Sequence, residues 1–166
     1  MSEELLRLDH VSIDYRVKDG YLSAVRDVTF GINKSEIFAV VGESGCGKST
    51  IAHSIMRLLG NNARVGGNIL FEGTDLTKLS DGELTKVRGH NIGMIFQNPL
   101  DSLNPVYATG EQVNEAILLD GVSKLDGWHK VIELYREMKM PDPEKRAEAY
   151  PHEMSGGMRQ RVMIAM

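Results

Sequence analysis

The stretch Gly42–Ser49 constrains the fold of this chain more than any other part of its sequence, because it matches the pattern G-x-x-x-x-G-K-[ST]. An uninterrupted apolar run, Ile37–Val41, leads into it, as in a strand that is buried on both faces of a parallel sheet. Apolar residues then recur at helical spacing from Ile51 to Leu59, and Gly60 is the expected C-cap of that helix. A strand, a glycine-rich loop and a helix in this order predict an α/β fold.

The chemistry that suits this loop is phosphate binding. Phosphate oxygens must approach main-chain N–H groups closely, and glycine leaves that approach open while permitting positive φ. The loop also delivers the phosphates to a helix N-terminus, where free N–H groups and the positive end of the helix dipole meet the anion. We expect Lys48 to hold β- and γ-phosphate oxygens and the Ser49 hydroxyl to coordinate Mg²⁺. The residues expected to line the site are Gly42, Glu43, Ser44, Gly45, Cys46, Gly47, Lys48, Ser49 and Thr50.

Antiparallel strands are predicted for the first third of the chain, where apolar and polar residues alternate on both sides of the turn Lys18–Gly20. Short strands are also expected at Asn68–Phe71 and at Ile92–Phe96. From Pro99 onward, helical spacing takes over, with one apolar stripe at residues 113–117 and another at 131–138. We interpret this part as a helical insert that follows the α/β part, with the stripes forming its core.

A second glycine-containing motif, Met154–Met158, lies near the end of the sequence. Apolar residues at helical spacing follow it, so Ser155 and two glycines stand at the N-terminus of another helix. This helix start is a second place where an anion could bind. Taken alone, the motif is better explained as an ordinary helix cap.

Composition excludes several classes of protein. The chain has 166 residues, 42% of them hydrophobic and 25% charged, which is the balance of a globular domain. A net charge of −4 without a basic cluster argues against a dedicated nucleic-acid binder. The single cysteine, Cys46, excludes an internal disulfide framework, and we interpret it as a small residue that fills the loop. Neither a signal peptide nor a membrane span is expected.

The two glycine-containing motifs together resemble those of the ATP-binding cassette (ABC) ATPases. Met154–Met158 is similar to the LSGGQ signature of that family, with methionine at its first and last positions. Gln97 falls where the family has its Q-loop glutamine, and Tyr15 falls where it has the aromatic residue that stacks on adenine. Tyr21 is the alternative for that stacking role. The resemblance implies a P-loop NTPase fold of ABC type, with an antiparallel β subdomain and a helical insert.

A narrower resemblance is to the importers of oligopeptides and dipeptides. Ile95–Pro105, the following Gly110–Gln112 and Tyr150–Val162 all look like the corresponding segments of that subfamily. The likeness extends from Leu6 to the last residue. It implies an ATP-binding subunit that powers peptide transport by ATP-driven dimerisation of two cassettes, with ATP or ADP and Mg²⁺ as cofactors. Such a subunit lies peripherally on the cytoplasmic face of the cell membrane.

The resemblance also implies roles for single residues. Gln97 is the expected catalytic residue, because it would contact both Mg²⁺ and the attacking water, and Ser49 is the second expected metal ligand. Across the dimer, the γ-phosphate held by one cassette would face the signature of the other, namely Ser155, Gly156, Gly157 and Met158.

The partners implied are a second cassette, identical or homologous, and membrane-spanning permease subunits. A peptide-binding protein would act indirectly, and no nucleic acid is expected. Exposed residues of the loop Leu100–Val106 are the expected docking surface for the permease.

The family's order continues beyond the signature helix with a Walker B strand, a catalytic glutamate and a switch histidine. The sequence stops at Met166, so we expect a C-terminally truncated cassette with an incomplete parallel sheet. Its expected parts are a β subdomain with an incomplete P-loop core in 1–98, a Q-loop-linked helical subdomain in 99–153, and the signature with the start of its helix in 154–166. Such a chain would bind ATP or ADP with little or no hydrolysis, and its unpaired strand would promote self-association.

Three alternatives are weaker. Ala116–Asp120 has the four-apolar-then-Asp form of a Walker B strand, but it precedes the signature, and its apolar residues continue a helical stripe. A DNA-associated ATPase of the same superfamily would carry long coiled-coil heptads between the two motifs, where this chain has short helices broken by Pro and Gly. A P-loop kinase would not account for the signature or the Gln97 region.

Overall fold

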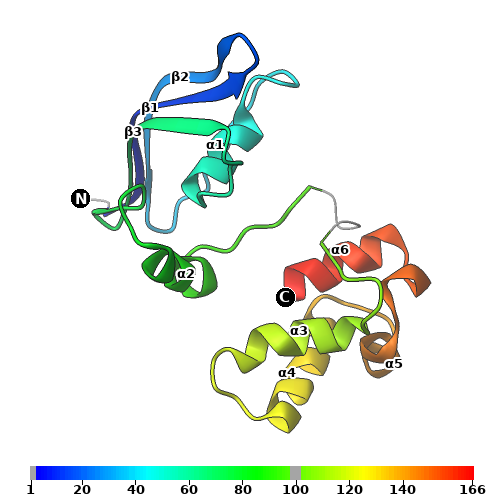
Figure 1. Ribbon diagram of the computed structural model, residues 1–166. Helices are drawn as coiled ribbons and strands as arrows, with labels where there is room; N and C mark the ends of the chain where they lie inside the picture. The colour runs from blue at the N-terminus through cyan, green and yellow to red at the C-terminus, as the bar shows by residue number, and fades with distance from the viewer. Residues whose placement is uncertain (1–2, 98–101) are drawn as a thin grey trace. The chain divides into compact units, whose positions relative to one another are not determined.

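The computed structural model describes residues 3–97 and 102–166 of the chain. Its contacts divide the chain into two compact units, Met1–Gly93 and Met94–Met166, which are described separately below (Figure 1). The start of the expected docking loop, Leu100 and Asp101, lies outside the described residues, as does the expected domain boundary at 98/99. No helix in the described ranges is long and apolar enough to cross a membrane.

The first unit is built on a four-stranded antiparallel sheet with strand order β2-β1-β3-β4. The strands are β1 (Glu4–Val17), β2 (Gly20–Asn33), β3 (Ala63–Phe71) and β4 (Thr74–Asp75). The predicted hairpin and the predicted strand at 68–71 are therefore confirmed. Helix α1 (Lys48–Ile55) lies beside the sheet (Figure 1), and its Ile51 and Ile55 pack against the core of the sheet. Helix α2 (Asp81–His90) follows β4 in the sequence.

A β-bulge in β1 changes which side chains face the core. Leu6 and Leu8 are buried before the bulge, and Val11 and Ile13 are buried after it. The register of β1 shifts against both β2 and β3 in this region, and His10 adopts a φ of 51°. One extra residue moves the inward positions from even to odd numbers, so both apolar sets reach one core. The alternation in the sequence predicted the strand but not the bulge.

The two strands predicted at Ile37–Val41 and Ile92–Phe96 are not formed, and these predictions were wrong. Neither segment has a hydrogen-bonded neighbour in the sheet, whose four strands all come from other segments. A strand needs a partner to satisfy its main-chain N–H and C=O groups. Without one, Ile37 is 99% exposed and Val41 is 90% exposed. The sheet of the described residues is antiparallel throughout, so no parallel strand pair forms there around the glycine-rich loop, and the P-loop domain is incomplete, as expected.

Helix α1 ends earlier than predicted, at Ile55, and Gly60 is not its C-cap. The N–H of Arg57 donates to the Ser54 carbonyl at 3.0 Å, and the N–H of Leu58 donates to the His53 carbonyl at 2.8 Å. This pair of bonds is a Schellman motif, which requires a left-handed residue just beyond the helix. Arg57 supplies it with a φ of 46°. The helix therefore closes before its apolar spacing ends.

The second unit is helical, as predicted. It contains α3 (Thr109–Leu118), α4 (Lys124–Glu137), α5 (Pro143–Glu148), the short 3₁₀ helix η1 (Pro151–Glu153) and α6 (Gly156–Ala165). Its core is made by fully buried residues from four of these helices: Val113, Val131, Tyr135, Ala147 and Val162. The two predicted apolar stripes supply the α3 and α4 members of this core. The Walker B-like stretch 116–120 is the end of α3 and the turn after it, which confirms the helical interpretation.

Candidate phosphate-binding site

The glycine-rich loop enters α1 through a backbone that favours glycine. Gly45 and Gly47 have φ values of 83° and 95°, and Gly47 is the N-cap of α1. A Cβ on Gly47 would lie 2.8 Å from the carbonyl oxygen of Ala24 and 3.1 Å from Cγ2 of Val25. The loop is thus held tightly against β2 at this point, and only glycine combines that φ with that contact.

The N-terminus of α1 has main-chain donors available for an anion. No side chain caps this end of the helix, and the Ile51 N–H makes a 2.9 Å bond to the Gly47 carbonyl. The N–H groups that precede Ile51 in the first turn have no partner within the helix. Together with the positive end of the helix dipole, they form a site of the kind that binds phosphate.

Lys48 brings its ammonium group back over the loop. Its Nζ donates to the Glu43 carbonyl at 2.6 Å, to the Gly42 carbonyl at 2.9 Å and to the Cys46 sulfur at 3.5 Å. A positive charge therefore stands directly above the loop whose N–H groups would receive the phosphates. An anion that enters the loop would replace one of these carbonyl oxygens as a hydrogen-bond acceptor of the ammonium group.

Ser49 is exposed and Thr50 is partly buried, both in the first turn of α1. Beside the loop lies a hollow of about 360 Å³, bounded by Lys48, Ser49 and apolar residues of β2, α1 and the segment between them. In that lining the rings of Phe30 and Phe38 stack with centroids 4.9 Å apart. A lysine ammonium, a serine hydroxyl and uncapped N–H groups around one exposed loop fit a polyphosphate with its divalent cation.

The two tyrosines considered for adenine stacking lie on neighbouring strands. Tyr15 is partly buried on β1 and packs against the core of the sheet. Tyr21 lies on β2 opposite Arg16 and is 61% exposed, so its ring is the more accessible of the two. The adenine-stacking role of Tyr15 stays a prediction.

The signature residues lie at the start of α6 in the second unit. Ser155 is the N-cap, and its Oγ accepts a 3.3 Å hydrogen bond from the N–H of Met158. Met154 is buried in the helical core and Met158 packs against it. A Cβ at Gly156 or Gly157 would meet no atom within 4 Å among the described residues. The packing of this unit therefore does not itself require either glycine.

Gln97 is exposed and lies outside any helix or strand, directly before the residues that the structure does not describe. The structure thus gathers Gly42–Thr50 into one loop and the first turn of α1 in the first unit, and Ser155–Met158 at one helix start of the second unit. The roles of Gln97 and of the signature toward a nucleotide stay predictions.

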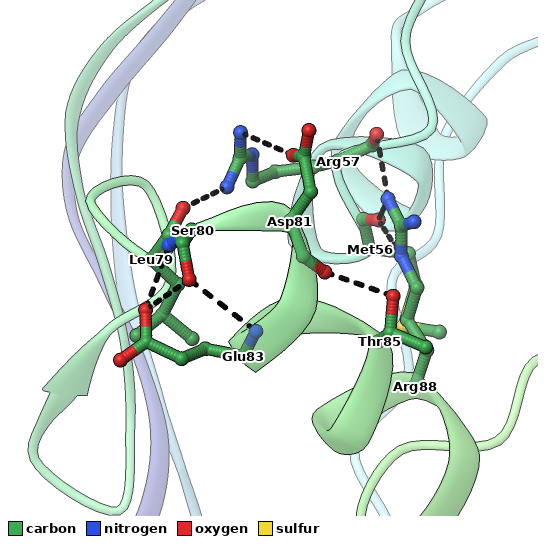
Figure 2. Close-up of polar contacts among 8 residues, drawn as sticks. All are labelled: Met56, Arg57, Leu79, Ser80, Asp81, Glu83, Thr85 and Arg88. Carbon is green, nitrogen blue, oxygen red and sulfur yellow. Dashed lines mark hydrogen bonds and ion pairs between the residues drawn. The ribbon is translucent and has the colours of Figure 1, made fainter.

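Sequence reasoning missed the residues that hold the other end of α1. Arg88 on α2 donates hydrogen bonds to main-chain carbonyls just beyond α1, and Arg57 reaches toward the start of α2 (Figure 2). Neither arginine carries a signal of this kind in the sequence, because the main-chain acceptors lie 22 and 32 positions away along the chain.

The fold and the loop define an α/β P-loop protein with an antiparallel β part and a separate helical part. The family model described as ABC transporter matches residues 25–166. The chain therefore belongs to the ABC transporter family, which confirms the resemblance of its two motifs and the predicted fold class.

Curated relatives agree with this assignment. The chain is 43% identical over 163 residues to the oligopeptide transport ATP-binding protein OppD of Salmonella typhimurium, covering 98% of this chain and 49% of that protein. It is 44% identical over 163 residues to OppD of Haemophilus influenzae, covering 98% of this chain and 50% of the relative. The chain thus spans about half the length of the curated relatives it matches.

Solved structures show the same fold. The ATP-binding cassette MJ0796, solved as a dimer in a post-hydrolysis state bound to ADP and Pi, matches with a TM-score of 0.85 and 27% identity. That match covers 97% of this chain and 68% of MJ0796. The fold of cbiO1 from Clostridium perfringens, part of the ABC transporter complex cbiONQ, matches with a TM-score of 0.76.

Proposed function

We propose that this chain binds ATP or ADP, together with Mg²⁺, as the nucleotide-binding part of a subunit that powers peptide import. The observation that carries the proposal is the position of Lys48, whose ammonium group lies over a glycine-rich loop at the uncapped N-terminus of α1. Phosphates bound there would receive hydrogen bonds from the loop and first-turn N–H groups and charge neutralisation from Lys48. Membership of the ABC transporter family supports a nucleotide as the phosphate carrier.

Two side chains would hold the cation. The exposed Ser49 hydroxyl is one proposed ligand, and the Gln97 side-chain oxygen is the other. When bound, Mg²⁺ offsets the negative charge that builds up on the phosphates during phosphoryl transfer. Gln97 would also orient the attacking water, which makes it the proposed catalytic residue.

The signature would act on the nucleotide of a second cassette. Gly156 and Gly157 leave open space at the N-terminus of α6, and no described residue of their own unit fills that space. Glycines have no side chain to block a ligand, and the N–H groups at a helix start are free to donate. A phosphate of a nucleotide bound to a second cassette could therefore approach this helix start closely. MJ0796, whose fold this chain shares, was solved as a dimer of cassettes bound to ADP and Pi, which supports this arrangement.

The substrate class comes from the relatives. Both OppD proteins are oligopeptide transport ATP-binding proteins, and 98% of this chain aligns with each of them. We therefore propose peptides as the cargo, membrane-spanning permease subunits as direct partners and a peptide-binding protein as an indirect one. The subunit would then lie on the cytoplasmic face of the cell membrane. No feature of the described residues favours a DNA-associated role or a kinase over this one.

This chain alone should turn over nucleotide slowly or not at all. Phosphate capture needs only Lys48, Ser49 and the loop N–H groups, whereas hydrolysis also needs a group that polarises water. The acidic candidate Asp120 lies in the turn after α3, not at the end of a strand.

The exposed side chains of Ile37 and Val41 also favour self-association of this chain in solution.

The test is a comparison of ATP binding and hydrolysis by the chain, by its Lys48→Ala variant and by a longer chain that matches the full length of the relatives. We expect the 166-residue chain and the longer chain to bind MgATP, and only the longer one to hydrolyse it. Lys48→Ala should weaken binding at least about tenfold, because it removes a charge-assisted contact. Equal binding by the variant would overturn the assignment of the phosphate site. Hydrolysis of ATP by the short chain would overturn the proposal that this chain alone turns over nucleotide slowly or not at all.

A further inference from the structure

Two arginines connect α1 and α2 in opposite directions (Figure 2). Arg57, just beyond the end of α1, donates from Nη1 to the Leu79 carbonyl at 2.6 Å, and its Nη2 lies 3.6 Å from Oδ1 of Asp81. Arg88, in the last turn of α2, reaches back to the end of α1. The start of α2 is therefore tied to Arg57, and its end is tied to the carbonyls beyond α1.

Arg57 occupies a position where glycine is usual. It is the left-handed residue of the Schellman motif, with a φ of 46°, and such a conformation costs a non-glycine residue roughly 1–2 kcal/mol. A glycine would close the helix without that cost but would leave the Leu79 carbonyl and Asp81 without the arginine. The residue at this position thus serves the connection to α2 as well as the helix end.

Arg88 supplies the partners that the end of α1 needs. Its Nε and Nη2 donate to the Met56 carbonyl at 2.9 and 2.6 Å, and Nη2 also donates to the Arg57 carbonyl at 2.9 Å. These three bonds satisfy carbonyls just past the last helical residue and place a positive charge at the negative end of the helix dipole. The side chain is partly buried, so solvent screens this interaction less than it would at the surface.

The helix between the two ends is short. With eight residues, α1 is about 12 Å long, so its phosphate-binding end and its arginine-bound end belong to the same two turns. Helix formation in so short a segment is cooperative, and a segment of this length is marginal without tertiary support. An anion at Lys48 and a guanidinium at Met56 therefore stabilise one and the same helix from its two ends.

We propose that Arg88 is a positioning residue that couples phosphate binding at the N-terminus of α1 to the order of α2. This inference rests on the proposed function of the glycine-rich loop. Binding that orders α1 fixes the Met56 and Arg57 carbonyls, and fixed carbonyls hold Arg88 and the helix that carries it. By reciprocity, an Arg88 that is in place lowers the cost of ordering α1 when phosphate binds. α2 is also the last helix before Gln97 in the sequence.

The experiment measures nucleotide affinity and amide hydrogen exchange on the complete chain, with and without MgATP. The variants are Arg88→Ala, the conservative Arg88→Lys, and Arg26→Ala as a matched loss of an exposed arginine from β2. In the natural sequence we expect MgATP to slow exchange both in the loop 42–50 and in α2. Arg88→Ala should weaken MgATP binding about five- to tenfold and abolish the protection of α2 while the saturated loop stays protected. Arg88→Lys should restore part of both effects, and Arg26→Ala should change neither.

A purely structural role would lower the stability of Arg88→Ala but leave the protection of α2 by MgATP intact, and that result would overturn the coupling. Should Arg88→Ala not fold, Arg88→Lys carries the test, because its single ammonium group keeps the positive charge but cannot reproduce the three bonds of the guanidinium. Undiminished affinity for MgATP together with undiminished protection of α2 in Arg88→Lys would overturn the coupling as well. If the natural sequence binds no MgATP, the proposed function fails and the coupling fails with it, whereas binding without protection of α2 defeats the coupling alone.

Discussion

The side chain of Gln112 holds both main-chain polar groups of Asn104. Its Oε1 accepts from the Asn104 N–H at 2.8 Å, and its Nε2 donates to the Asn104 carbonyl at 3.0 Å. The same Nε2 donates to the Tyr107 carbonyl at 3.1 Å, and the residue is only 8% exposed. One amide group therefore fixes the loop before α3, which presents Val106 and Tyr107 to the outside with 69% and 54% of their surfaces exposed.

Removing that amide should loosen the loop. We expect Gln112→Glu to lower the free energy of unfolding by roughly 2–3 kcal/mol, because a carboxylate at this buried position cannot donate to the two carbonyls and would face them with another acceptor. Denaturant unfolding and amide exchange of residues 104–107 measure the effect. Glu115→Gln, on the exposed side of α3, is the control and should change stability by less than about 0.5 kcal/mol. A stability loss shared equally by both variants would contradict the role assigned to Gln112.

Two glycine-to-alanine changes should have opposite effects in the first unit. Gly47→Ala places a Cβ 2.8 Å from the Ala24 carbonyl at a φ of 95°, so we expect a loss of at least about 2 kcal/mol of stability and a loss of phosphate binding. Gly82→Ala, in α2, meets no atom within 4 Å and should gain about 0.5–1 kcal/mol from helix propensity. Chemical denaturation of the two variants side by side checks both signs. A neutral Gly47→Ala would mean that the loop is not held against β2 as described.

The pair His10–Asp27 should make stability depend on pH. Their side chains lie 2.6 Å apart, and the hydrogen bond to Asp27, helped by the charge of that carboxylate, raises the pKa of His10 above its ordinary value of 6.5. Because the folded-state pKa is raised, the stabilisation is fully present below the unfolded pKa and is lost as pH rises through the folded one.

Asp27→Asn should therefore cost stability at pH values below about 6.5 and little at pH values well above the folded pKa. Asparagine tolerates the left-handed backbone that Asp27 adopts, so the variant isolates the charge. Titration of the His10 ring by NMR should show its pKa fall in Asp27→Asn and stay put in Asp19→Asn, a matched loss of a carboxylate from the hairpin turn. A His10 pKa that is the same in all three proteins would rule out the pairing.

Sequence reasoning predicted the parts of this protein that depend on local patterns. The glycines of the phosphate loop, the Ser155 cap and the apolar stripes of α3 and α4 all follow from spacing along the chain, and the structure places them as predicted. Sequence reasoning failed where an element depends on a partner that is distant in the sequence. The run Ile37–Val41 has the composition of a buried strand, but a strand also needs a neighbour, which no local pattern can supply.

Helix ends were missed for a related reason. Gly60 was the reasonable C-cap from sequence alone, because glycine adopts the left-handed conformation at no steric cost. The structure closes α1 with Arg57 and α4 with Lys139, both at positive φ, and an arginine from another helix donates to the carbonyl of each. Arg88 and Arg161 thus support helix ends that the residues themselves disfavour. Only tertiary contacts reveal this arrangement.

Tyr135 lies in the core of the helical unit, and its buried hydroxyl should make stability depend on pH. Burial raises the pKa of its hydroxyl to about 12, and the nearby Thr109 hydroxyl opposes part of that rise. The Thr109 hydroxyl donates its proton to the Arg146 carbonyl at 3.0 Å, so it can donate to an ionised Tyr135 only by giving up that bond. The folded state thus strongly favours the neutral phenol, and its contribution to stability should decline as pH rises from about 10 toward about 12.

Tyr135→Phe should keep the packing and remove that pH dependence, with a change in unfolding free energy at neutral pH within about 1 kcal/mol of zero. Tyr135→Ala, by contrast, should cost roughly 3–5 kcal/mol, because it empties a fully buried site in the core. Denaturant unfolding at pH 7 and near pH 11, with tyrosinate absorbance followed in parallel, measures both effects. If Tyr135→Phe were as damaging as Tyr135→Ala, the hydroxyl and not the ring would hold the core together, contrary to the packing observed here.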